Sequence, residues 1–160
     1  MFYIPFQSYM NFDQFVKALP EGLVYAPIYA KGTRMLSGKP ATGKNPLEAS
    51  YEQKFGPADV ALAVKRNPDL KAVGVFTGIR GNGIVILDVD RNLSKYLKAW
   101  GSSLDGAPII TSTKANAAKY LFRVPEELWA DVKGHGLRKE DGGDYEILWG
   151  RQGVVFGAYP

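Results

Sequence analysis

The chain has 160 residues, 46% of them hydrophobic and 22% charged, which suffices for one domain with a core and is short for two. It contains no Cys and one His, which excludes disulfide scaffolds, Cys-ligated zinc, cysteine nucleophiles and multi-histidine metal sites. The formal net charge of +4 leans mildly toward a polyanionic partner, while the lack of a bilayer-length apolar run or a signal peptide predicts a cytoplasmic protein without a membrane partner.

Apolar spacing and turn residues divide the chain into helices and strands. In chain order, the predicted elements are a helix over 11–19, a strand over 23–30, a helix over 57–66, strands over 73–77 and 83–90, a helix over 94–100, and strands over 107–111, 119–124, 144–149 and 154–156. Residues 78–82, with their glycines and asparagine, indicate a hairpin between the two strands that they join. The strand over 119–124 is expected to pair with its predecessor. The sequence contains no repeat and no linker, so we predict a single compact α+β domain over 1–160, built around a mainly antiparallel sheet with flanking helices.

A basic loop over 37–46 follows the first predicted strand and is rich in turn-forming residues. Its glycines and lysines suggest a phosphate-binding loop, but Asn45 stands where that motif needs Ser or Thr to bind the metal. We interpret the segment as a solvated loop whose Lys39 and Lys44 can contact a nucleic-acid backbone.

The strand predicted over 83–90 ends abruptly in two carboxylates, Asp88 and Asp90. Its continuous Ile, Val and Leu run is typical of a strand buried on both faces, and alternation along a strand puts both aspartates on one face. Like charges about 6–7 Å apart, at about 3.3 Å rise per residue, repel each other unless a cation lies between them. Mg²⁺ and Mn²⁺ accept such oxygen ligands. Alternatively, Asp88 begins a turn and Asp90 caps the next helix, and a lone D-x-D leaves both interpretations open.

Glu146 is the candidate for a third carboxylate at this site. It lies within an apolar strand, where an acid without a partner is costly unless it binds metal or faces a base. The alternative is that its face of an antiparallel sheet is exposed to solvent. Asp144, next to two glycines, is more easily explained as a turn residue.

Several polar residues are candidates for holding phosphate groups. Lys119 precedes an apolar strand and follows a polar loop, so it could offer a point charge to a triphosphate while Ser112 and Thr113 donate hydrogen bonds. The alternative for Lys119 is a solvent-facing lysine at a strand edge. Arg80 and Arg91 flank the aspartates and could contact nucleotide phosphates or balance the charge of the carboxylates. His135, between two glycines, is interpreted as a loop residue.

The order of these segments resembles the N-terminal primase-polymerase domain of bifunctional replication proteins from phages and plasmids, a branch of the archaeo-eukaryotic primase superfamily. The similarity runs over most of the chain. The matching segments are G-K-x-P within 43–47, G-V-x-T-G within 73–78, the D-x-D strand over 84–90, a T-x-S-G-G-x-H-x-Y-F block within 111–125, and the last acidic strand within 145–155. The family usually continues beyond the point where this chain stops, so the resemblance implies a fragment of a larger replication protein with a helicase domain C-terminal to it.

The resemblance implies an RRM-like catalytic core that performs template-directed nucleotidyl transfer as a DNA primase or DNA polymerase. Asp88, Asp90 and Glu146 would be the catalytic residues and would hold two metal ions, Mg²⁺ or Mn²⁺. Nucleoside triphosphates would be held by Lys119, Ser112, Thr113, Arg80 and Arg91. Single-stranded DNA template or primer-template would contact Lys39, Lys44 and Lys114.

One position departs from the family pattern: the family has a histidine where this chain has Lys119, and the glycines of the preceding loop are replaced by Asn116 and Ala117. A lysine offers charge but not the planar hydrogen bonding of histidine. The departure motivates an alternative function, a weak or inactive domain that binds nucleotide or single-stranded nucleic acid within a replication complex. A haloacid-dehalogenase-like phosphatase ranks last, because the Arg91-Asn92 pair and the hairpin pattern fit that family poorly.

Overall fold

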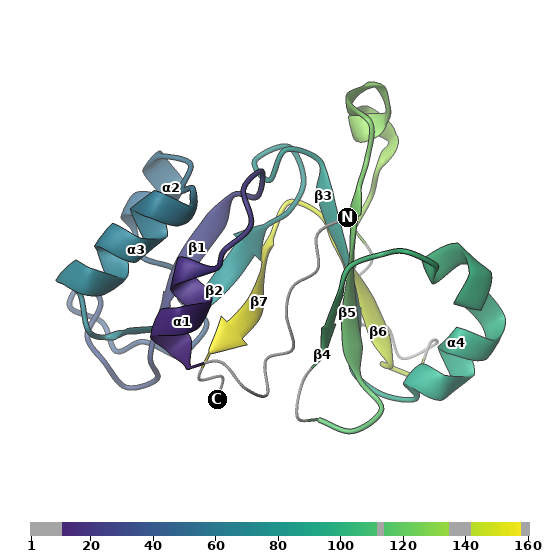
Figure 1. Cartoon of the computed structure of the whole chain (residues 1–160), viewed down its shortest axis with the longest axis horizontal. Coiled ribbons are helices and arrows are strands. Elements are labelled where there is room, and N and C mark those ends of the chain that lie inside the picture. Colours follow the sequence, from purple (N-terminus) through teal and green to yellow (C-terminus); the bar gives the residue numbers. More distant parts are fainter. Residues whose placement is uncertain (1–10, 112–113, 135–141, 158–160) are drawn as a thin grey trace. The chain divides into compact units, whose positions relative to one another are not determined.

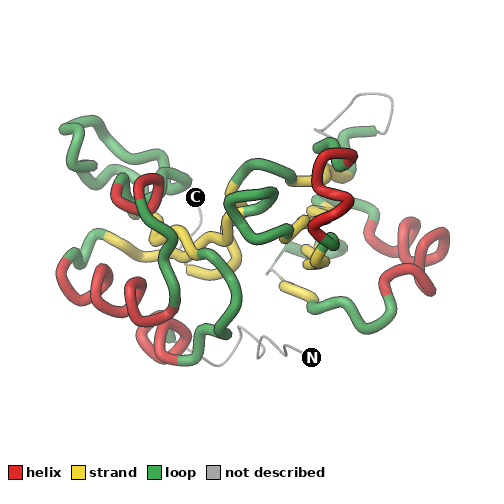
Figure 2. Tube along the Cα trace, turned by 90° about the horizontal axis from the view of Figure 1, so that it is seen from above, coloured by secondary structure: helices red, strands yellow, loops and turns green. Residues whose placement is uncertain are grey.

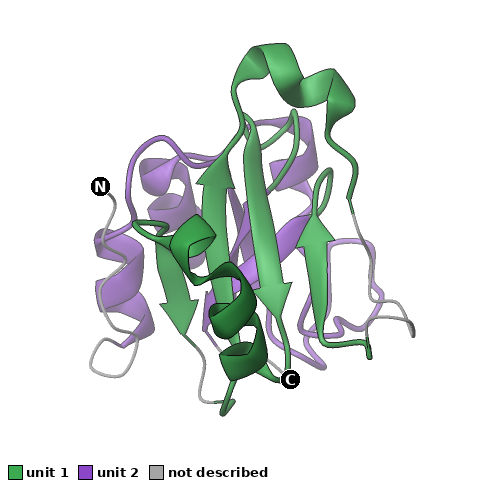
Figure 3. Cartoon of the chain, turned by 90° about the vertical axis from the view of Figure 1, so that its right-hand side faces the viewer, with its two compact units in different colours: residues 1–8, 77–151 green, residues 9–76, 152–160 purple. Residues whose placement is uncertain are grey.

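The computed structural model describes residues 11–111, 114–134 and 142–157. Residues 77–151 form one unit, which we call the inserted unit, and the segments before and after it form a second, the outer unit (Figure 3). Each unit contains an antiparallel sheet of its own (Figure 2). The predicted α+β class is therefore confirmed, but the strands make two sheets where the sequence indicated one.

The outer unit places helices against a three-stranded sheet of order β1-β2-β7 (Figure 1). Its elements are α1 (Phe12–Lys17), β1 (Tyr25–Tyr29), α2 (Ala49–Glu52), α3 (Pro57–Arg66), β2 (Leu70–Phe76) and β7 (Gln152–Gly157). Asn11 caps α1 as expected, since its side chain accepts a hydrogen bond from the Gln14 N–H at 2.9 Å. Strand β1 is buried along its whole length, because apolar residues pack on both of its faces.

The inserted unit carries a four-stranded antiparallel sheet of order β4-β5-β3-β6. Its elements are β3 (Ile84–Val89), α4 (Leu93–Trp100), the 3₁₀ helix η1 (Gly101–Leu104), β4 (Ile109–Thr111), β5 (Ala118–Arg123), the 3₁₀ helix η2 (Glu126–Asp131) and β6 (Tyr145–Leu148). Helix α4 and η1 cover one face of this sheet, where Leu87 packs in a cluster with Trp100, Leu104 and Tyr120. Because side chains alternate along a strand, Asp88 points to the opposite face of β3.

The predicted hairpin between 73–77 and 83–90 is wrong. The reversal itself forms, since the Gly83 N–H donates to the Gly78 carbonyl at 2.9 Å and Gly78 bridges to Ile84. Beyond it, however, β2 pairs with β1 and β7, whereas β3 pairs with β5 and β6. The turn residues specify a local reversal, and the strands pair with partners that are distant in the sequence. The predicted pairing of β5 with its predecessor β4 is confirmed.

The inserted unit begins and ends at two residues that bind each other. Both the backbone N–H and the hydroxyl of Thr77 donate to the Arg151 carbonyl at 2.7 Å, and the Arg151 N–H donates to the Thr77 hydroxyl at 3.1 Å. The next residues outward, Phe76 and Gln152, are cross-strand partners in β2 and β7. The chain thus enters and leaves this unit through neighbouring backbone positions. Within the residues that the structure describes, no helix combines the length and the apolarity that crossing a bilayer requires.

Candidate carboxylate site

Asp88 occupies the centre of a row of charged residues that crosses the sheet of the inserted unit. In the strand register it lies directly opposite Lys119 on β5 and directly opposite Glu146 on β6. Directly paired residues of an antiparallel sheet project to the same face, with Cβ atoms about 4.5–5.5 Å apart. Lys119, Asp88 and Glu146 therefore stand side by side, and the Asp88 residue is only 8% exposed.

Asp90 continues this face one pleat beyond Asp88, immediately after the end of β3. Its N–H donates to the Asp144 carbonyl at 2.8 Å, which continues the pairing of β3 with the β6 side of the sheet. Asp90 does not cap the next helix. Helix α4 begins after Asn92, and the Ser94 N–H in its first turn donates to the Asn116 side chain at 3.0 Å. Asp90 is thus left facing the same way as Asp88.

Glu146 has a pKa above the ordinary value of a glutamate. Burial makes the largest contribution, because the charged form loses hydration. The negative charges of Asp88 and Asp90 raise the pKa further, while Arg151 and Lys119 oppose the rise. Glu146 is therefore close enough to Asp88 and Asp90 for their charges to act on it, and a cation bound among the three carboxylates would relieve that repulsion.

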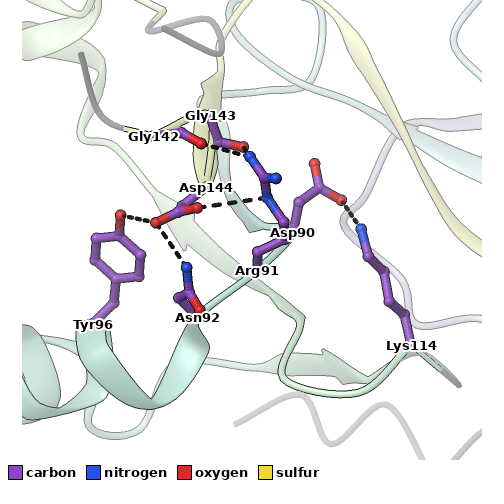
Figure 4. Close-up of polar contacts among 8 residues, drawn as sticks. All are labelled: Asp90, Arg91, Asn92, Tyr96, Lys114, Gly142, Gly143 and Asp144. Carbon is purple, nitrogen blue, oxygen red and sulfur yellow. Dashed lines mark hydrogen bonds and ion pairs between the residues drawn. The ribbon is translucent and has the colours of Figure 1, made fainter. Parts of the chain in front are cut away.

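Two lysines neutralise the aspartates. The Lys119 ammonium forms an ion pair with Asp88 Oδ2, in which the side chains are 25% and 12% exposed. The Lys114 ammonium lies 3.2 Å from Asp90 Oδ1 on a more open part of the surface (Figure 4). The two lysines that the sequence assigned to nucleotide and nucleic acid thus contact the carboxylates themselves, and their predicted phosphate-binding roles stay predictions.

The donor set suits a hard divalent cation, but the side chains are not gathered around one. Three carboxylates on one face, one with a raised pKa, are the oxygen ligands that Mg²⁺ and Mn²⁺ prefer. Among the described residues, however, no group of three or more His, Cys, Asp or Glu is arranged to hold a metal ion. The Lys119 ammonium lies on Asp88 Oδ2, so a metal that uses this oxygen requires the ammonium to leave it.

Asp144 anchors the loop that carries Asp90. It is 5% exposed and accepts hydrogen bonds from the Tyr96 hydroxyl at 2.9 Å and the Asn92 amide at 3.2 Å, with the Arg91 Nε 3.5 Å away (Figure 4). These contacts lower its pKa, those with Asn92 and Tyr96 most strongly. Arg91 also donates to the carbonyls of Gly142 and Gly143, so it binds this loop, and its predicted contact with nucleotide is not tested.

From the sequence, Asp144 is interpreted as a turn residue, and its side-chain partners are not predicted. The two glycines before it are a turn signal, and the Tyr96 hydroxyl that reaches it comes from 48 residues earlier in the chain. Arg151 was missed as well, although it opposes the pKa rise of Glu146. Its position in a short turn between two strands carries no local sign of this role.

Replacing Asp144 with Asn should lower the melting temperature at neutral pH, by an amount that shrinks as the pH falls. The folded-state pKa of Asp144 lies below its ordinary value of 3.8, so its stabilising contribution is complete above that value and is lost as the pH falls through the folded-state pKa. Thermal unfolding of both proteins between pH 7 and pH 2.5 checks this. Asp105→Asn, at an exposed acid of the same unit, should change little, and a wild-type advantage over Asp144→Asn that stays constant with pH would contradict the assignment.

The backbone of Arg80 lies near the end of β3 that is opposite to Asp88. It lies in the turn before β3, and Ile84, where that strand begins, is about 13 Å from Asp88 at about 3.3 Å per residue. The predicted contact of Arg80 with the triphosphate stays a prediction. The candidates Ser112 and Thr113, and the loop residue His135, lie outside the described residues.

Lys39 and Lys44 are exposed in the loop of the outer unit. The side chain of Asn45, which excluded a phosphate-binding loop, accepts hydrogen bonds from the N–H and the hydroxyl of Thr42 at 2.7 and 2.8 Å. The Gln152 amide donates to the Lys44 carbonyl at 3.0 Å. The loop is thus held by hydrogen bonds of the Asn45 side chain and of the Gln152 side chain on β7.

Comparisons of this chain with protein-family models, with curated proteins and with solved structures found no match.

Proposed function

We propose that the chain is a metal-dependent, template-directed nucleotidyltransferase of the primase-polymerase kind. The proposal is carried by the cross-strand register in which Asp88 has Glu146 as its neighbour on β6, with Asp90 one pleat further on the same face. This register gathers the acids of the D-x-D motif and of the last acidic strand, which the sequence resemblance assigned to one centre. The setting for such a reaction is the cytoplasm of the cell whose DNA is copied.

In the proposed reaction, a 3′-hydroxyl attacks the α-phosphate of an incoming nucleoside triphosphate and pyrophosphate leaves. Asp88, Asp90 and Glu146 would hold Mg²⁺ or Mn²⁺, which when bound would activate the attacking oxygen and neutralise charge on the phosphates. Lys119 lies in the same row, so its ammonium can contact the triphosphate. Arg151, whose charge acts on Glu146, would add positive potential to the site.

Exposed lysines would bind the DNA template without reading its sequence. Lys39 and Lys44 project from the fixed loop of the outer unit, and contacts of this kind with phosphates weaken as the salt concentration rises. Base pairing with the template would then supply the selectivity for the incoming nucleotide, so the protein itself needs only backbone contacts.

A second candidate function is supported by the two ion pairs. Since Lys119 already neutralises Asp88 and Lys114 lies on Asp90, the chain could bind nucleotide or single-stranded nucleic acid without performing catalysis. This candidate differs from the first in needing no metal at the carboxylates.

Incubation of the protein with homopolymeric single-stranded DNA, labelled nucleotides and Mg²⁺ or Mn²⁺ separates the two candidates. The proposed enzyme should incorporate the complementary nucleotide, with or without a primer, and incorporate the other three at least about a hundredfold more slowly. Each donor or acceptor left unpaired in a mispair costs about 1–3 kcal/mol, and geometric selection at the site adds to this cost. Salt-sensitive oligonucleotide binding without any incorporation would refute the enzyme and favour the second candidate.

A further inference from the structure

The ion pair between Lys119 and Asp88 occupies the oxygen that the proposed metal site needs. Building on the proposed function, we propose that Lys119 is an exchangeable internal cation: it neutralises Asp88 in the free protein and moves to the triphosphate when nucleotide and metal bind. The exchange would make the binding of metal and the binding of nucleotide depend on each other.

The register directs the ammonium to Asp88 in the free protein. Lys119 lies between Ile110 on β4 and Asp88 on β3, and Ile110 is an apolar, buried neighbour that offers it no acceptor. The Lys119 side chain nevertheless keeps 25% of its surface exposed. A flexible four-carbon stem with its head near solvent can change partners without any movement of the strand.

The charges of the row make the ammonium and a metal ion compete. The Lys119 ammonium forms an ion pair with Asp88, which lies directly opposite Glu146, so Lys119 already performs part of the neutralisation that a divalent cation would perform. A dication bound to Asp88 would lie next to the ammonium and repel it. The phosphates of a nucleotide supply new acceptors for that ammonium, so they remove the obstacle to the metal. By linkage, the metal then strengthens nucleotide binding by the same factor.

The second ion pair is a weaker obstacle. In the pair of Lys114 with Asp90 the side chains are 55% and 38% exposed, against 25% and 12% for Lys119 with Asp88. Solvent screens the exposed pair more strongly, and such surface pairs contribute little. Removing the charge of Lys119 should therefore change metal binding much more than removing that of Lys114.

The test is to measure Mn²⁺ binding by the electron paramagnetic resonance signal of free Mn²⁺, with and without a non-hydrolysable deoxynucleoside triphosphate analogue. The free analogue also binds Mn²⁺. This background is measured with the Asp88→Asn variant and is subtracted from the Mn²⁺ binding of the other proteins. In the wild type, the analogue should tighten Mn²⁺ binding at least about tenfold, a typical size for coupling between sites. In Lys119→Met, Mn²⁺ alone should bind at least about tenfold more tightly than in the wild type, and the analogue should add only a few-fold. Lys98→Met, at an exposed position of α4, should behave as the wild type.

Lys119→Arg gives an independent outcome if the Met variant does not fold. A guanidinium holds a carboxylate by two hydrogen bonds, so Mn²⁺ alone should bind this variant at least a few-fold more weakly than the wild type. An Mn²⁺ affinity of Lys119→Met equal to that of the wild type would overturn the exchange. If only Lys119→Arg folds, an unchanged Mn²⁺ affinity of that variant would do the same. A wild-type protein in which the analogue does not tighten Mn²⁺ binding would also overturn it. If nucleotides are incorporated while Lys119→Met leaves Mn²⁺ affinity unchanged, the exchange fails and the proposed function stands. If coupling is found without incorporation, the proposed function fails alone.

Discussion

Asp88→Asn is expected to reduce nucleotide incorporation by at least about a thousandfold while the protein stays folded. Asparagine keeps the shape of the side chain but removes the charge at the centre of the row between Lys119 and Glu146. Losing a single transition-state contact costs about a hundredfold to a thousandfold, and here the lost group would also hold the metal. Steady-state incorporation by the purified variant, compared over a range of Mn²⁺ concentrations, measures the effect.

Asp131→Asn is the matched control for this experiment, because Asp131 is an exposed aspartate at the end of η2 in the same unit. It should retain wild-type activity. Circular dichroism of Asp88→Asn should show the wild-type spectrum, since Lys119 keeps contact with solvent after losing its partner. A folded Asp88→Asn within tenfold of wild-type activity would rule out the carboxylate row as the active site.

Gly83→Ala is expected to lower the free energy of unfolding by about 2–4 kcal/mol, the sum of a strained backbone and an overpacked contact. Gly83 has a φ of +81°, and a Cβ there would lie 2.7 Å from the Val124 carbonyl oxygen and 2.5 Å from the Trp129 indole nitrogen. The same glycine accepts a hydrogen bond from the Val124 N–H at 2.8 Å, next to the first pair of β3 and β5. The carbonyl belongs to the backbone of this pairing, so it cannot move away without disturbing the start of β3.

Gly106→Ala separates the two causes. Gly106 has a similar φ of +77°, but a Cβ there has no atom within 4 Å, so only the backbone cost of about 1 kcal/mol applies. Urea unfolding of both variants measures the difference. Equal losses at the two positions would show that the close approach at Gly83 does not matter.

Several predictions that came from local patterns agree with the structure. The helix over 57–66 begins with Pro57 in its first turn and ends before Asn67, as the end signals indicated. The run of apolar residues that ends at Asp88 forms β3, an inner strand that pairs with β5 and β6. The alternation of side chains along a strand is enough to predict that Asp88 and Asp90 lie on one face. These features depend on residues within a few positions of each other.

What the sequence could not provide were partners brought from far along the chain. The turn at 78–83 has the residues of a hairpin, yet β2 joins β7 and β3 joins β6, and nothing in the turn specifies those partners. The same holds for Lys119, whose ion pair with Asp88 follows from a register between strands about thirty residues apart. The side-chain partners of Asp144 could not be predicted for the same reason, since Tyr96 reaches it from α4.

The hydrogen bonds between Thr77 and Arg151 make residues 77–151 a cassette. Its two ends meet, and just outside them Phe76 and Gln152 are already paired. A two-residue Asn-Gly turn from Phe76 to Gln152 would therefore close β2 and β7 into an ordinary hairpin and keep the order β1-β2-β7. The same adjacency would let the cassette be moved into another host loop, with the carboxylates, Lys119 and Asp144 travelling together. One contiguous segment, 77–151, therefore carries all the residues of the carboxylate site.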